Sequence, residues 1–172
     1  YIFKNGSTID ILAARESSRG QRRHCIVVEE SILMDGDALN EIIIPTTNID
    51  RLLGDGSKHP EELVNKSQTF ITTAGWKNSF PYDKLIDMLI NSIIDPDQYM
   101  VIGGTFETPV KEGLLDEDFV DKLKLEGTFN DSSFDREYRS VWSGDAENAY
   151  FSSEVFDKHR QLLQPEYEHS GR

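Results

Sequence analysis

A short apolar run at residues 25–28 stops abruptly at two adjacent carboxylates, Glu29 and Glu30. An uninterrupted apolar run of this length is typical of a strand buried on both faces, as strands are in parallel sheets. Carboxylates at the end of such a strand are costly to bury unless a cation or hydrogen-bond donors meet them. The run therefore predicts a core strand with a chemically useful polar end, although a strand that simply leaves the core would show the same pattern.

Strands and helices alternate along the rest of the chain. The helix at residues 85–94 is the best supported, because its apolar residues recur on one helical face and Asp95 and Pro96 follow it. We also predict strands at 7–13, 69–74 and 99–102, helices at 37–44, 116–125, 132–142 and 153–163, and a long loop at 46–68.

Such alternation implies parallel strands joined by helical crossovers, and thus an α/β fold. In folds of this kind the working groups collect at the carboxyl ends of the strands. Three predicted strand ends therefore matter, at residues 29–30, 72–73 and 103–104.

The charge balance disfavours a protein that binds nucleic acid over its whole surface. The chain has 31 acidic and 18 basic residues, for a formal net charge of −13, whereas contact with phosphates needs clustered Lys and Arg. Residues 1–24 are the exception, with five basic residues against two acidic ones. This basic cluster is either a solvated turn before a strand or a loop that faces phosphate.

Cysteine usage and hydropathy bear on where the protein works. The single Cys25 leaves no intramolecular disulfide framework, and no long uncharged apolar run is present to span a membrane. We therefore expect a cytoplasmic protein with no membrane partner. Cys25 belongs to the apolar run, so we expect it to be buried and unreactive. Because the chain starts at Tyr1 rather than Met, we expect it to be a piece of a longer protein.

Several short motifs occur in the order found in one protein family. Glu-Ser-Ser-Arg-Gly at 16–20 precedes the apolar run and its two glutamates, and Thr-Thr-Ala-Gly follows at 72–75. Further along, Phe-Asp-Arg-Glu-Tyr at 134–138 precedes Trp-Ser-Gly at 142–144. In sequence and order these motifs resemble the ATPase domain of phage large terminases and the segment that closes that domain before a nuclease domain.

The resemblance implies a RecA-like P-loop ATPase of the additional-strand type, with a parallel sheet, flanking helices and a helical C-terminal segment. Residues 1–130 would be the distal part of the ATPase core, and residues 131–172 a closing segment toward a missing nuclease domain. The domain would be partial, because the phosphate loop G-x-x-x-x-G-K-[ST] occurs nowhere in the sequence and lies upstream of this region in the family.

The function implied by the resemblance is ATP hydrolysis, with Mg²⁺, that drives double-stranded DNA into a viral procapsid. The implied partners are DNA, other large-terminase subunits in a ring, the small terminase and the portal. The implied location is the cytoplasm of a bacterial host.

The resemblance also implies a role for each candidate residue. Glu29 would be the Walker B acid that helps hold Mg²⁺, although the family more often has Asp there, and Glu30 would be the catalytic base that orients water. Arg19 would be an arginine finger offered to a neighbouring subunit's ATP. Thr72 and Thr73 would belong to the coupling motif that senses the γ-phosphate. These roles are not required by the sequence: Arg19 would also fit a solvated loop, and Thr72 and Thr73 would also fit a strand end because threonine favours strands.

Two other functions fit the same sequence. One is a non-catalytic α/β interaction module, in which Glu29, Glu30 and the acidic helices bind a basic partner. The other is a helicase-like translocase, since acids at strand ends serve there too. Mg²⁺-dependent ATP hydrolysis by the full-length protein would separate the first alternative from the terminase hypothesis.

Overall fold

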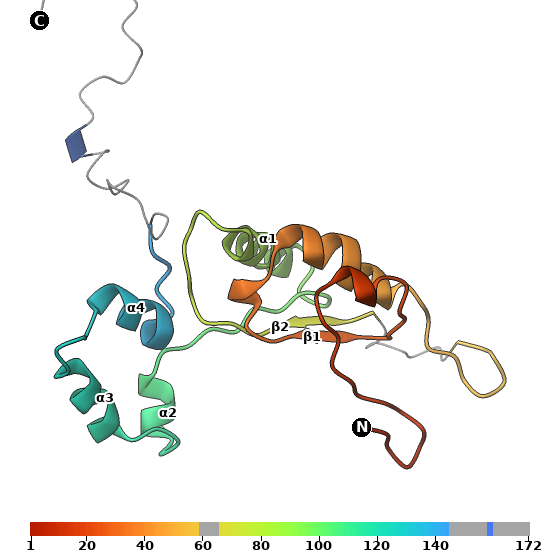
Figure 1. The fold of residues 1–172 in the computed structure, drawn as a ribbon, viewed down its shortest axis with the longest axis horizontal. Coiled ribbons are helices and arrows are strands. Elements are labelled where there is room, and N and C mark those ends of the chain that lie inside the picture. Colours follow the sequence, from red (N-terminus) through yellow and green to blue (C-terminus); the bar gives the residue numbers. More distant parts are fainter. Residues whose placement is uncertain (59–65, 145–157, 160–172) are drawn as a thin grey trace, which may run out of the picture. The chain divides into compact units, whose positions relative to one another are not determined.

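The computed structural model describes residues 1–58, 66–144 and 158–159. The chain divides into two compact units, Tyr1–Thr72 and Thr73–Arg172. Together they make a mixed α/β protein with a small parallel sheet in the first unit and helices in both (Figure 1). In the ranges that the structure describes, none of the helices combines the length and hydropathy needed to cross a bilayer.

The sheet of the first unit has two strands in the described part of the chain. Strand β1 (Ile26–Val28) pairs in parallel with β2 (Gln68–Phe70), with Ile26 opposite Gln68 and Val28 opposite Phe70. Ile26 and Val28 are buried, but Val27 is 64% exposed. The strand predicted at 25–28 is therefore present, but the prediction that both of its faces are buried is wrong.

Cys25 lies outside β1 and is exposed. The expectation that it is buried is thus wrong as well. The sequence pattern misled because an apolar run shows that a strand is present but not how many layers cover it.

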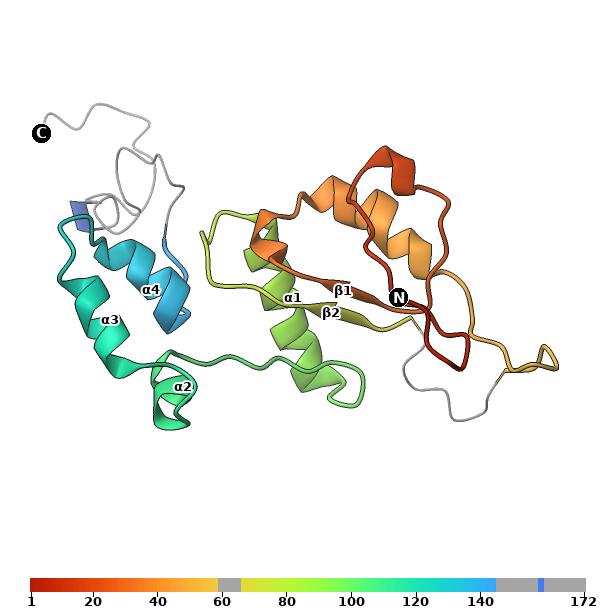
Figure 2. The ribbon, with the colours of Figure 1, turned by 60° about the horizontal axis from the view of Figure 1, so that its bottom comes forward.

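A continuous helical stretch supplies most of the first unit's core. It consists of a π-helix, η3 (Ala38–Ile43), followed by a 3-10 helix, η4 (Ile44–Thr47), and both views show it beside the strands (Figures 1 and 2). The predicted helix at 37–44 is found, but Pro45 does not end the helical stretch, because it occupies the first turn of η4, where its missing N–H is tolerated. The apolar residues that this stretch buries are Leu39, Ile42 and Ile43.

The two threonines that end η4 are also buried. Thr46 donates its hydroxyl to the Ile43 carbonyl at 2.7 Å, and Thr47 donates to the Ile44 carbonyl at 2.8 Å. These bonds satisfy hydroxyl groups that would be costly to bury unpaired. The loop predicted at 46–68 therefore begins later than expected, after two core residues.

The second unit is helical in its described part. Helix α1 spans Phe80–Ile94, α2 Glu107–Lys111, α3 Glu117–Lys124 and α4 Asp131–Arg139 (Figure 1). The helices predicted at 85–94, 116–125 and 132–142 are thereby confirmed, with shifted ends. Capping fixes two of the starts, because Asp116 accepts a hydrogen bond from the Asp118 N–H and Asn130 accepts one from the Ser133 N–H.

Aromatic side chains form the core between α4 and the segments around α2 and α3. Phe134 is 5% exposed and stacks on Tyr138, with 4.8 Å between ring centroids. The Phe106 and Phe129 rings each lie 5.5 Å from that of Phe134. Phe106 directly precedes α2 and Phe129 directly precedes the Asn130 cap of α4, so the cluster joins α4 to the segments next to it.

The segment that follows Thr73 is tied to the segment that follows α4. Gly75 accepts a hydrogen bond from the Ser143 N–H at 2.9 Å, and the Lys77 N–H donates to the Ser143 carbonyl at 2.9 Å. The Arg136 guanidinium lies over the Trp76 ring, 4.3 Å from its centroid. Two of the motif regions singled out in the sequence, 72–75 and 142–144, thus contact each other.

Two predicted strands are absent. Residues 7–13 contribute only an isolated bridge between Ile2 and Thr8, and residues 99–102 form no strand. Ile11, Met100 and Ile102 are 100%, 71% and 81% exposed. Apolar sequence is not sufficient for a strand, because its backbone groups also need a partner strand.

The remaining expectations have mixed outcomes. The strand predicted at 69–74 is present but short, since β2 ends at Phe70. The helix predicted at 153–163 lies outside the described residues, apart from 158–159, which are helical. The functional division between residues 130 and 131 stays a prediction.

Candidate functional site

Glu29 and Glu30 follow β1 directly, and both are exposed. Glu30 has φ 49° and ψ 49°, which is the left-handed helical region. The chain turns there into a short 3-10 helix, η2 (Ser31–Leu33), whose Leu33 N–H donates to the Glu30 carbonyl at 2.9 Å. An L-residue in this region carries a conformational cost of about 1 kcal/mol or more, so neighbouring groups must hold the turn in place.

The end of β2 supplies those groups. The Ser31 N–H donates to the Ile71 carbonyl at 3.0 Å, and the Ile32 N–H donates to the Thr72 hydroxyl at 2.9 Å. The Ile71 N–H in turn donates to the Val28 carbonyl at 2.9 Å. The structure therefore brings the Glu29 and Glu30 turn and Thr72 to one edge of the sheet, as parallel pairing predicts.

Two other positions were expected at this edge, Thr73 and residues 103–104. Thr73 is partly buried and is the first residue of the second unit, so the two threonines of the predicted coupling motif belong to different units. Residues 103–104 do not follow a strand. The prediction that three strand ends form the edge is wrong for the third, because its strand is absent.

Within the described structure, Arg19 bonds to residues near it in the fold and not to the residues at the edge of the sheet. Its Nε donates to Glu16 Oε2 at 2.8 Å and its Nη2 to Glu16 Oε1 at 2.9 Å, while Nη1 donates to the Glu41 carbonyl at 3.2 Å. The Glu16 side chain belongs to the 3-10 helix η1 (Glu16–Ser18), which contacts η3. Among the described residues, no hydrogen bond or ion pair joins Arg19 to Glu29, Glu30 or Thr72.

The Glu16–Arg19 pair changes the titration of both groups. The hydrogen bonds from Arg19 lower the pKa of the Glu16 carboxyl, and the same bonds raise the pKa of Arg19. Both side chains are well exposed, at 74% for Glu16 and 49% for Arg19, so water and salt screen the pair strongly. Sequence reasoning assigned no role to Glu16, although its spacing of three residues from Arg19 was a signal.

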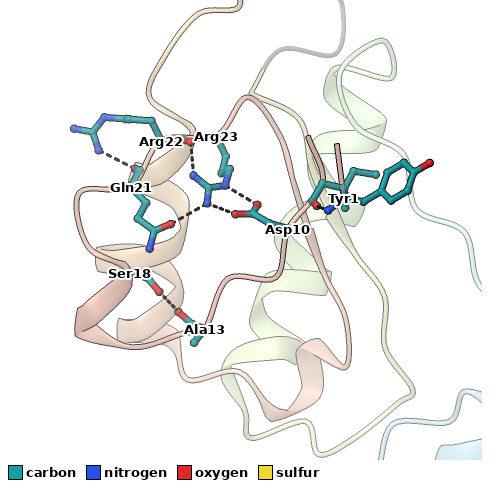
Figure 3. A network of polar contacts seen from close by, with 8 residues as sticks. Tyr1, Asp10, Ala13, Ser18, Gln21, Arg22 and Arg23 are labelled. Atoms are coloured by element: carbon teal, nitrogen blue, oxygen red, sulfur yellow. Dashed lines mark hydrogen bonds and ion pairs between the residues drawn. The ribbon is translucent and has the colours of Figure 1, made fainter. Parts of the chain in front are cut away.

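A second network fixes the loop that carries Arg19 (Figure 3). The Arg23 guanidinium donates from Nε to Asp10 Oδ1 at 2.8 Å, from Nη2 to Asp10 Oδ2, and from Nη2 to Gln21 Oε1 at 2.8 Å. The hydrogen bonds from Arg23 lower the pKa of Asp10. Ser18, which is 3% exposed, donates its hydroxyl to the Ala13 carbonyl at 2.5 Å.

These contacts bear on the basic cluster at residues 1–24. Arg19 and Arg23 already have carboxylate partners within the chain, in Glu16 and Asp10. Because both guanidinium groups are already paired, the interpretation of the basic cluster as a solvated turn gains support for these two residues.

Glu29 and Glu30, at the edge of the sheet, can contribute ligands to a cation site but do not make a complete one. No group of three or more His, Cys, Asp or Glu side chains gathers into a metal-binding cluster in the part of the chain that the structure describes. Mg²⁺, however, is usually held by one or two carboxylates together with phosphates and water. The exposed carboxylate of Glu29 fits that type of site, with the phosphates supplied by a nucleotide.

Comparison with protein-family models, with curated proteins and with solved structures gave no match to this chain.

Proposed function

We propose that this chain is the distal part of a RecA-like ATPase domain of the large-terminase type, whose ATP hydrolysis drives double-stranded DNA into a viral procapsid. The observation that carries the proposal is the parallel pairing of β1 with β2, which sets Glu29, Glu30 and Thr72 at one edge of the sheet. In P-loop nucleotidases the nucleotide and its Mg²⁺ meet the protein at such an edge. The order of the sequence motifs supports the same assignment.

Each residue at this edge of the sheet would have a distinct role in ATP hydrolysis. Glu29 would help hold Mg²⁺, which when bound neutralises charge on the β- and γ-phosphates. Glu30 would orient the attacking water and accept a hydrogen bond from it, a role that its exposed carboxylate permits without any burial of charge. Thr72 and Thr73 would link the state of the γ-phosphate to movement.

Arg19 would act at the nucleotide of a neighbouring subunit. Its bonds to Glu16 are surface contacts, and such pairs contribute little to stability, so a phosphate can replace the carboxylate as its partner. Guanidinium groups bind phosphate and carboxylate oxygens with the same forked geometry. This role requires a ring of subunits, and on the same proposal the small terminase, the portal and DNA are partners in the cytoplasm of the host cell.

The test is a pair of substitutions in the full-length protein. Glu30→Gln keeps the shape of the side chain but removes the carboxylate, so we expect hydrolysis to be abolished while ATP binding persists. Glu29→Gln should instead weaken Mg²⁺-dependent binding of ATP. Steady-state ATPase rates and equilibrium nucleotide binding measure the two effects, and identical behaviour of the two variants in both assays would refute this division of roles.

The same proposal predicts the behaviour of the 172-residue chain alone. The sequence has no phosphate loop, whose backbone amides and lysine position the β- and γ-phosphates, so we expect no meaningful ATP turnover. If the full-length protein also lacks Mg²⁺-dependent ATPase activity, the non-catalytic interaction module becomes the better description.

A further inference from the structure

The two residues that follow Glu30 are both tied to the end of β2. Ser31 donates its N–H to the Ile71 carbonyl at 3.0 Å, and Ile32 donates its N–H to the Thr72 hydroxyl at 2.9 Å. Ser31 is 8% exposed, whereas Ile71 is 48% exposed. The turn that carries Glu30 is thus fastened to a segment forty positions away in the sequence.

The left-handed backbone of Glu30 makes this attachment important. A glutamate with φ 49° is strained, and it keeps that conformation only where the surrounding structure determines it. The bond from Ser31 to Ile71 joins two backbone groups and forms with any side chains. The bond from Ile32 depends on a side chain, the hydroxyl of Thr72.

The chemistry of that hydroxyl is specific. A threonine hydroxyl has one donor hydrogen and two acceptor lone pairs, and the Ile32 N–H uses one of the lone pairs. Serine would keep the acceptor, whereas valine has nearly the same shape but no acceptor. Thr72 is exposed, so either replacement can be made without a cavity in the core.

We propose that Thr72 is a positioning residue for Glu30, because its hydroxyl fixes the backbone turn on which the Glu30 carboxylate stands. The inference rests on the proposed function of Glu30, and it gives Thr72 a task that is separate from sensing phosphate. Thr72 sets where the carboxylate of Glu30 lies before any nucleotide binds, through the Ile32 amide and η2.

The first part of the test is structural and does not depend on catalysis. In the full-length protein, hydrogen exchange of the Ile32 amide should be about fivefold faster in Thr72→Val than in the wild type, which is the effect expected for one lost hydrogen bond. Thr72→Ser should restore the wild-type rate, and Thr73→Val is the matched control. The Ile71 amide, which donates to the Val28 carbonyl, reports whether the sheet stays intact in each variant.

The second part is kinetic and compares Thr72→Val and Thr72→Ser with the wild type. Thr72→Val should lower kcat for ATP by between about 10-fold and 100-fold, the range expected when a catalytic group is misplaced, with KM for ATP little changed. Thr72→Ser should recover most of the rate. Unchanged Ile32 exchange in Thr72→Val would overturn the hydrogen bond, and faster exchange with unchanged kcat would overturn the positioning role. A wild-type protein without ATPase activity would instead overturn the proposed function, and with it any catalytic meaning of the turn.

Discussion

Glu30 carries a backbone strain that can be measured without an activity assay. Its φ is positive, and glycine adopts such a conformation without the clash that an L-residue suffers. We therefore expect the free energy of unfolding of Glu30→Gly to exceed that of Glu30→Ala by about 1 kcal/mol, as measured by urea denaturation. Glu29, which has no positive φ, provides the control, because there alanine should be at least as stable as glycine. If the glycine and alanine variants had the same order of stability at positions 29 and 30, the left-handed turn would be contradicted.

Asp50 predicts how the stability of the chain depends on pH. The amino groups of Lys58 and Lys66 bond to its carboxylate, with Lys66 Nζ 2.9 Å from Oδ1, and they lower its pKa from 3.8 to about 2. Because the folded-state pKa is below the unfolded one, the stabilising effect is complete above about pH 4 and is lost as the pH falls toward 2. Urea denaturation at several pH values in this window should show a shallower pH dependence for Asp50→Asn than for the wild type. Lys58→Gln and Lys66→Gln should each reduce the same slope, and a wild-type slope in all three variants would contradict the interaction.

Contacts between single residues were predictable only where they are local. The spacing of Glu16 and Arg19 is enough to suggest their ion pair. The pairing of Arg23 with Asp10 and of Ile32 with Thr72 depends on how distant segments fold back, which no local pattern encodes. The sequence thus located Glu30 and Thr72 as candidates but gave no sign of the bond that relates them.

At the level of elements, helices were more predictable than strands. A helix satisfies its own backbone groups, so the periodicity of residues 85–94 was sufficient to predict α1. A strand needs a partner, and the apolar residues 99–102 have none in the described structure. The same dependence explains why β1 was found correctly but its exposed face, at Val27, was not.

The aromatic cluster gives a prediction for α4. Phe134 is buried among Phe106, Phe129 and Tyr138, so we expect Phe134→Ala to lower the free energy of unfolding of the second unit by about 3 to 5 kcal/mol. The matched control is Phe119→Ala on α3, where the residue is 51% exposed and the expected loss is only about 1 kcal/mol. Near-ultraviolet circular dichroism and thermal unfolding measure both variants, and a loss for Phe134→Ala as small as that of the control would show that the cluster does not stabilise the unit.

For the whole molecule, the boundary between the compact units lies between Thr72 and Thr73. This boundary was not predicted, because residues 69–74 were predicted to form one strand. Thr72 bonds to the turn of Glu30, and Gly75, two residues after Thr73, bonds to Ser143 beyond α4. If the proposed function is correct, the short segment from Thr72 to Gly75 covalently connects the sheet edge that carries Glu29 and Glu30 to the second unit.

The ring mechanism makes the most demanding prediction, because it concerns subunits that must complete each other's sites. An arginine finger acts on charge that develops in the transition state, so Arg19→Ala in the full-length protein should bind ATP normally but lose about 10³- to 10⁵-fold in rate. If the finger acts in trans, a subunit without Arg19 still has its own Glu30, and a subunit without Glu30 still has its own Arg19.

Mixing the Arg19→Ala and Glu30→Gln subunits in equal amounts then separates action in trans from action in cis. Random assembly into a ring would give a complete site at about one interface in four, so a comparable fraction of wild-type ATPase activity should return if each site works independently. The control replaces the Glu30→Gln subunit with one that carries both substitutions, since no subunit in that mixture has Arg19 and no activity should return. An inactive mixture of the two single variants would place the finger in cis, whereas a normal rate for Arg19→Ala alone would make Arg19 a surface residue paired with Glu16 and Glu41.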